Sequence, residues 1–190
     1  MDEVEKLIEQ LKDEDEYVRD SAGYALGRLG DERAIQPLIE RIYDESSPIV
    51  SDAASNALVE IGERAVKALI ESLTYDGNND GTYAIEALGR IGDKRAVKPL
   101  IKVLKYIDDG TRRSAVRALG RLGDVRAVEP LINALKDDDP FVRERVSIVL
   151  ETIGGEKAIE ALKNREPDES IRNLLEANPH RLVSRSMNHL

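Results

Sequence analysis

Apolar residues recur along the chain in two blocks, and both blocks return at an interval of 31 residues. Within each block the apolar positions lie three or four residues apart, which is the spacing of an amphipathic helix. Each repeat therefore predicts two helices, one for each block. The column of the second helix holds Leu7-Ile8, Leu38-Ile39, Leu69-Ile70, Leu100-Ile101 and Leu131-Ile132.

Capping residues indicate where these helices begin and end. The first helix of the first repeat is expected from about Tyr17 to Leu29, with Asp15 as its N-cap. Gly30 supplies a left-handed stop, and the second helix is expected to start at Asp31. In later repeats the start signal is a capping residue followed by proline, in Ser47-Pro48 and Asp139-Pro140.

A single helical hairpin cannot bury its apolar faces, whereas stacked hairpins close a continuous core. The predicted fold class is therefore all-α, a right-handed α-α superhelix (solenoid) of about five 31-residue helical hairpins with terminal caps. Residues 1–13 are expected to form an N-terminal capping helix and residues 164–190 a C-terminal half repeat and tail. The repeat array between them, residues 14–163, divides into 14–44, 45–75, 76–106, 107–137 and 138–163.

The segment VRDSAGYALGRLGDERAIQPLI, residues 18–39, resembles the HEAT-like repeat of the phycobilisome-lyase type. The resemblance covers about residues 1–163 and implies a short member of the HEAT/armadillo α-solenoids, with the second helices lining the concave face. Members of that group are mostly protein-binding scaffolds, and a minority are chromophore lyases, hydroxylases or DNA-repair enzymes. Because one fold supports these different activities, the resemblance predicts the fold more closely than the function.

The amino-acid composition argues against several classes of function. The net charge of −9 argues against binding to nucleic acids or anionic membranes, which are themselves negative. The absence of cysteine excludes disulfides, zinc–thiolate sites and thiol catalysis. No apolar run is long enough to span a bilayer, and the acidic, helical start is unlike a signal peptide, so the expected location is the cytoplasm.

The sequence offers no set of convergent catalytic residues. Its histidines are His180 and His189, both in the predicted tail, so no repeat contributes a histidine to a Ser-His-Asp set. The resembling hydroxylases need repeated His-Glu pairs for two irons, and this chain has none. The expectation is therefore a chain that is not an enzyme and needs no cofactor.

The third repeat departs from the others at the loop YDGNNDG. Asp76, Asn78 and Asp80 match the opening of an EF-hand calcium loop, but its twelfth position is Ala87 rather than the bidentate glutamate. Ala87 also belongs to the predicted core. The alternative is a polar turn that caps a shortened helix.

Basic residues concentrate in residues 94–126, in two helical stripes. Lys98, Lys102 and Lys105 form one on a second helix, and Arg113, Arg117 and Arg121 form the other on the next first helix. The stripes predict an anion-binding patch for an acidic or phosphorylated segment of another protein. The alternative is pairing with acidic residues of neighbouring repeats, for which the candidates are Glu71, Glu86 and Glu129.

A further basic column recurs in every repeat and consists of Arg33, Arg64, Arg95, Arg126 and Lys157. A residue that is constant from repeat to repeat suits pairing between repeats, here with Asp31, Asp93 and Asp124. Ligand specificity is expected where the repeats differ.

The variable, outward positions of the second helices are therefore the candidate partner-binding residues. Tyrosine suits such an interface because it offers apolar area with little entropy to lose, although the same tyrosines would also cover gaps beside irregular loops. The candidates are Glu40, Arg41, Tyr43, Glu71, Tyr75, Lys98, Lys102, Lys105, Tyr106 and Asn133. The leading hypothesis is a scaffold that binds a partner segment on the concave face; the alternatives are a subunit of a bilin chromophore lyase and an engineered repeat protein.

Overall fold

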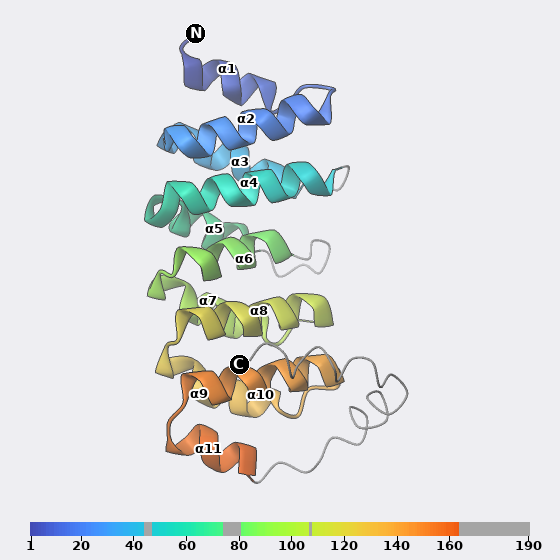
Figure 1. Ribbon diagram of the computed structural model, residues 1–190, viewed down its shortest axis with the longest axis vertical. Helices are drawn as coiled ribbons and strands as arrows, with labels where there is room; N and C mark the ends of the chain where they lie inside the picture. The colour runs from blue at the N-terminus through green and yellow to red at the C-terminus, as the bar shows by residue number, and fades with distance from the viewer. Residues whose placement is uncertain (44–46, 74–80, 107, 164–190) are drawn as a thin grey trace, which may run out of the picture.

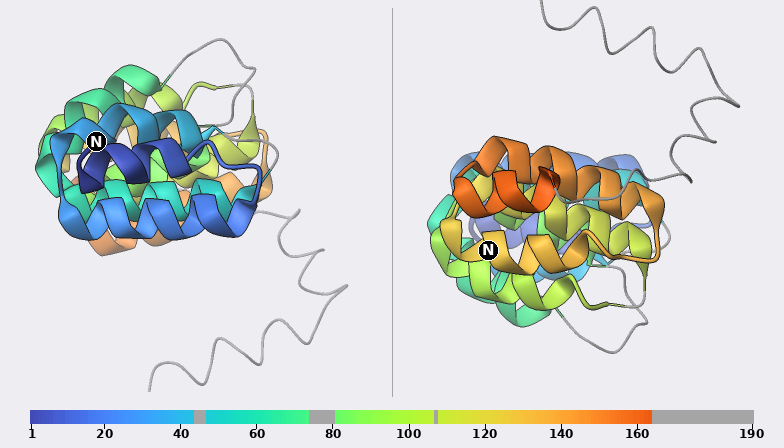
Figure 2. Two further views of the ribbon diagram at one scale, coloured as in Figure 1. Left: turned by 90° about the horizontal axis from the view of Figure 1, so that it is seen from above. Right: turned by 90° about the horizontal axis from the view of Figure 1, so that it is seen from below.

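The computed structural model describes residues 1–43, 47–73, 81–106 and 108–163. In these residues the chain forms two layers of helices. The helices lie across the long axis of the molecule and are stacked along it in chain order, as Figures 1 and 2 show. The first layer holds the first helix of each repeat: α2 (Glu16–Leu29), α4 (Pro48–Ile61), α6 (Thr82–Ile91), α8 (Asp109–Leu122) and α10 (Pro140–Ile153).

The second layer holds the second helices. It consists of α1 (Glu3–Gln10), α3 (Ile35–Ile42), α5 (Val66–Ser72), α7 (Val97–Val103), α9 (Val128–Ala134) and α11 (Glu156–Lys163). A single 3₁₀ turn precedes each of the four central ones: η1 (Glu32–Ala34), η2 (Gly62–Ala65), η3 (Lys94–Ala96) and η4 (Val125–Ala127). The predicted all-α solenoid is confirmed, and the described residues contain no strand.

The predicted capping residues are where the sequence indicated. Asp15, Ser47 and Asp139 each accept a hydrogen bond from a backbone N–H in the first turn of the helix that follows. Gly30 ends α2 in the left-handed conformation, with φ of 63°, which a residue with a Cβ rarely adopts. Local sequence therefore fixes the ends of the first-layer helices.

A spine of leucines joins the repeats. Leu38, Leu69, Leu100 and Leu131 are each 0% exposed and belong to one continuous hydrophobic core. These leucines come from four successive second helices, so the apolar faces of neighbouring repeats close against each other, as the repeat pattern predicts.

The first-layer helices pack much more closely on one another than the second-layer helices do. A Cβ placed on Gly27 would lie 2.7 Å from the Cα of Ala57, and one placed on Gly89 would lie 2.8 Å from the Cα of Ala118. Close spacing in one layer favours bending of the array toward that layer. This spacing argues against the expectation that the second helices line the concave face, which stays a prediction.

Helix α6 is shorter than its neighbours, with 10 residues where the other first-layer helices have 14. It begins at Thr82, after Gly81 in a left-handed conformation with φ of 57°. Ala87 is fully buried in α6, as its place in the core predicts. Asp76, Asn78 and Asp80 lie outside the described residues.

The ends of the chain fit the predicted organisation as far as they are described. Helix α1 packs on α2 and on η1, the place expected for an N-terminal cap. The predicted half repeat and tail, residues 164–190, lie outside the described residues, and so do His180 and His189. None of the helices in the described ranges has the length and apolar character needed to cross a membrane.

Candidate functional site

The predicted partner-binding residues lie on the second layer, and we call them the second-helix surface. Those inside the described ranges are Glu40, Arg41, Tyr43, Glu71, Lys98, Lys102, Lys105, Tyr106 and Asn133, whereas Tyr75 lies outside them. They come from α3, α5, α7, α9 and the residues that directly follow α3 and α7.

The lysines of this surface are exposed cations. Lys98 and Lys102 lie on α7, Lys105 follows it, and none of the three makes an ion pair with the described part of the chain. The acidic candidates proposed to neutralise them are engaged elsewhere. Glu71 lies 3.8 Å from Lys67, and Glu129 lies 3.7 Å from Lys157.

The tyrosines of the surface are tied to the stacking of the repeats. Tyr43 is half-buried, and its hydroxyl donates to the carbonyl oxygen of Ser72 over 2.7 Å, which links one repeat to the next. Tyr106 is half-buried against the core. Their proposed role as anchors for a partner stays a prediction, but both already stabilise the array.

The recurring basic column contacts the preceding repeat, but the prediction was wrong about the aspartates, because each one pairs with the arginine of its own repeat. Arg95 binds Asp93 over 2.6 Å and also donates to the carbonyl oxygen of Glu63, over 3.0 Å, in the preceding repeat. Arg126 binds Asp124 over 2.8 Å and reaches the carbonyl oxygen of Lys94 in the same way. We call this set of contacts the Asp-x-Arg ladder.

The aspartates of the ladder are held ionised. Hydrogen bonds from the side chain and then from the backbone N–H of Arg126 keep the pKa of Asp124 well below its usual range, and Arg95 lowers the pKa of Asp93 in the same way. A folded-state pKa below the unfolded value contributes stability that is present above the unfolded pKa and is lost as the pH falls through the folded one.

We therefore expect the melting temperature to be nearly constant from about pH 7 to about pH 5 and to fall below about pH 4, near the ordinary aspartate pKa. Differential scanning calorimetry across this range measures it. The Asp124→Asn variant should melt lower at neutral pH and lose less on acidification. A wild-type melting temperature that rises on acidification would contradict the role given to these aspartates.

Part of the arginine stripe of α8 pairs with an acidic residue of a neighbouring repeat, which was the alternative to an anion-binding patch. Arg117 and Arg121 lie 3.8 Å and 3.6 Å from Glu86 of the preceding repeat. Arg113 pairs with Asp109 of its own helix over 2.9 Å. The two basic stripes therefore differ, because the arginines form ion pairs and the lysines on and after α7 form none with the described residues.

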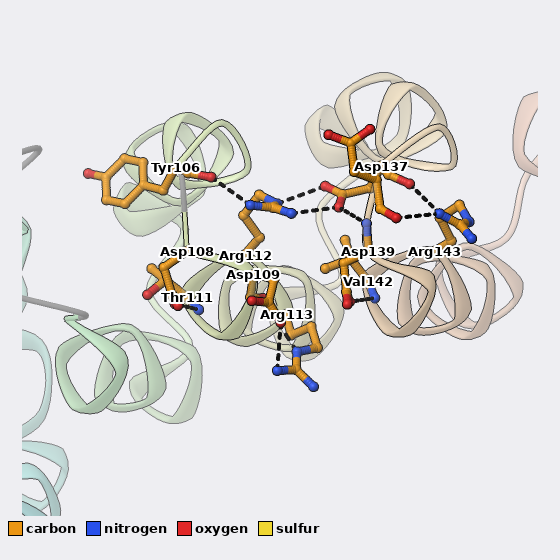
Figure 3. Close-up of polar contacts among 11 residues, drawn as sticks. Tyr106, Asp108, Asp109, Thr111, Arg112, Arg113, Asp137, Asp139, Val142 and Arg143 are labelled. Atoms are coloured by element: carbon orange, nitrogen blue, oxygen red, sulfur yellow. Dashed lines mark hydrogen bonds and ion pairs between the residues drawn. The ribbon is translucent and has the colours of Figure 1, made fainter. Parts of the chain in front are cut away.

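A buried ion pair, which the sequence analysis did not single out, lies within the fourth repeat and joins the start of α8 to the loop before α10 (Figure 3). The Nε and Nη2 atoms of Arg112 donate to the two carboxylate oxygens of Asp137 over 2.8 Å and 2.7 Å. Arg112 also donates to the carbonyl oxygen of Tyr106, and Arg143 to that of Asp137. The side chains of Arg112 and Asp137 are only 12% and 9% exposed.

Burial alone would raise the pKa of Asp137. Hydrogen bonds from Arg112 and from the backbone N–H of Asp139 outweigh the burial, and the net pKa of Asp137 is lowered. The pair is thus ionised at neutral pH. The attraction between the two charges offsets the cost of removing each from water, so neither charge is stable there without the other.

The described residues hold no group of three or more histidine, cysteine, aspartate or glutamate side chains placed to bind a metal ion.

Proteins of known structure share this architecture. A chain of the complex of CpcE and CpcF of phycocyanin lyase from Nostoc sp. PCC7120 is similar, with 26% identity, a TM-score of 0.65, and coverage of 75% of this chain and 96% of that one. Human deoxyhypusine hydroxylase is 20% identical with a TM-score of 0.50, covering 92% of this chain and 82% of that chain, a likeness of fold alone. No curated protein matches the chain.

The family of HEAT repeats matches residues 4–82, 82–132 and 108–178, most of the chain. These matches span the stacked helical pairs described above, from α1 to α11. The chain belongs to the HEAT repeat family.

Proposed function

We propose that the chain is a non-enzymatic protein–protein interaction scaffold that binds an acidic segment of a partner protein on its second-helix surface. The observation that carries the proposal is the group of exposed cations on and after α7. Lys98, Lys102 and Lys105 have no ionic partner within the described ranges, in a chain whose net charge is −9.

The location of these lysines supports binding rather than stacking. The arginines of the Asp-x-Arg ladder pair with an aspartate of their own repeat and donate to the backbone of the preceding one. The lysines of α7 instead extend from a surface that varies from one repeat to the next. At the position of Lys102, the neighbouring repeats have Glu40, Glu71 and Asn133. A surface of this kind distinguishes partners by charge, because bringing like charges together is unfavourable by several kcal/mol and opposite charges speed association.

The test compares two variants with the same change in net charge. The Lys98→Glu/Lys102→Glu variant should recover about tenfold less of its partners in a pull-down with quantitative mass spectrometry. The control, Lys6→Glu/Lys12→Glu, changes exposed lysines of α1 and the residues after it, at one end of the array. Equal recovery by the two variants would refute binding at the second-helix surface.

The similarity to the phycocyanin lyase complex favours a second candidate function, a subunit of a bilin chromophore lyase that acts with a paired subunit. Incubating the chain with a bilin and an acceptor protein tests it, alone and with a candidate paired subunit. A covalent adduct with a shifted absorbance spectrum would support the lyase function, and its absence from both mixtures would count against it.

A further inference from the structure

An open hollow with a volume of about 460 Å³ lies on the first layer, away from the second-helix surface. Residues of α6, α8 and α10 border it, together with Asp108, the N-cap of α8. It opens beside the start of α6, which has four residues fewer than the helices on either side of it. The hollow thus belongs to the irregular third repeat and its two successors.

Three guanidinium groups and one aromatic ring line this hollow: Arg113, Arg117, Arg145 and Phe141. The Arg113 guanidinium lies 5.8 Å from the centre of the Phe141 ring, an arrangement that holds a cation beside an apolar surface. Phe141 is 38% exposed, so part of its ring is available for contact.

The arginines of the hollow are accessible to a ligand. The pair of Arg113 with Asp109 is exposed, with 43% and 46% of the two side chains accessible, and Arg117 lies 3.8 Å from Glu86. Exposed pairs of this kind contribute little, so an incoming carboxylate can compete for the same guanidinium groups. Arg145 is exposed and makes no ion pair with the described residues.

Two carboxylates also line the hollow and limit what it accepts. Asp108 is engaged by the backbone of α8, because it caps that helix and accepts from the N–H of Thr111. Glu144 lies on α10 among the lining residues. The net charge of the lining is therefore positive, and one of its two carboxylates, Asp108, already caps α8.

Figure 3 shows that Arg112 and Arg113, although adjacent, point to different sides of α8. Arg112 extends toward the buried Asp137, whereas Arg113 is turned toward Asp109 on the other side of the helix. Arg112 is therefore engaged in a buried ion pair, whereas Arg113 lies at the surface.

We infer that this hollow is a second binding site, which takes an acidic segment of a partner protein. The carboxylate groups of the segment meet Arg113, Arg117 and Arg145, and an apolar side chain beside them meets Phe141. The aromatic wall favours a peptide over an inorganic anion, because only the peptide also buries apolar surface against the ring. The site lies on the other layer from the lysines of α7, so it does not depend on the function proposed for them.

Fluorescence anisotropy of the full chain with a short labelled peptide that repeats Glu-Glu-Leu tests this inference. The peptide should bind, should bind more weakly as salt is added, and should bind about tenfold more weakly to Arg145→Ala and to Phe141→Ala. A peptide that repeats Lys-Lys-Leu should not bind. In the Lys98→Glu/Lys102→Glu background, Arg145→Ala should still weaken binding of the peptide about tenfold, which separates this site from the second-helix surface.

Circular dichroism melting of each variant confirms that it is folded before its affinity is compared. The inference is overturned if the acidic peptide does not bind, if Arg145→Ala and Phe141→Ala bind it as the wild type does, or if the lysine variant alone loses it. Displacement of the peptide by inorganic phosphate at an equal concentration would overturn the assignment to a peptide.

Discussion

Replacing Arg112 with alanine is expected to lower the free energy of unfolding by about 3 kcal/mol, because it leaves the carboxylate of Asp137 buried without its ionic partner. Asp137 is 9% exposed and receives both of its charged hydrogen bonds from Arg112. The same change removes the hydrogen bond to the carbonyl oxygen of Tyr106. Urea denaturation followed by circular dichroism measures the loss.

The neighbouring residue supplies the control. Arg113→Ala removes an exposed pair within one helix and should change the free energy of unfolding by no more than about 0.5 kcal/mol. If the two variants unfold at the same urea concentration, the ion pair of Arg112 with Asp137 does not have the strength that its burial indicates.

The second large effect is expected at the contact between α2 and α4. Gly27→Ala should cost about 1–3 kcal/mol, because its new Cβ would lie 2.7 Å from the Cα of Ala57 and the two helices would have to separate. The atom that it meets is backbone, which cannot move aside as a flexible side chain does.

Gly23, one turn earlier in the same helix, is the matched control. A Cβ there would have its nearest neighbour at 3.6 Å, the Cβ of Ala53, which is an ordinary contact. Gly23→Ala should therefore stabilise the chain by about 0.5–1 kcal/mol, the usual gain of alanine over glycine inside a helix. Thermal unfolding of the two variants should shift in opposite directions, and a shift of Gly27→Ala to higher temperature would contradict the close packing.

The sequence predicts most of this fold because the repeat leaves few alternatives. Caps such as Asp15 and Ser47 fix the helix starts, and the leucine column that includes Leu69 has no other place to be buried. The Asp-x-Arg ladder was predictable in part. A basic residue present in every repeat suits a contact with the neighbouring repeat, but its aspartate partner lies two residues earlier in the same repeat.

What the sequence did not predict depends on distances between helices. The pair of Arg112 with Asp137 joins positions 25 residues apart, and the repeat pattern alone does not say which loop aspartate meets which helix. The hollow beside Arg145 arises only when α6, α8 and α10 stand side by side and α6 begins late. Predicting these features requires the distances and angles between packed helices, and neither composition nor periodicity gives them.

The close contacts between first-layer helices also decide how the array can deform. With Gly27 against Ala57 and Gly89 against Ala118, that layer can neither shorten nor stretch easily, whereas the second layer has fewer contacts to break. Elastic bending therefore changes mainly the separation of α3, α5, α7 and α9. A ligand spread across the lysines of α7 and the helices beside it would then set the curvature of the whole molecule, and with it the direction in which the chain ends present anything attached to them.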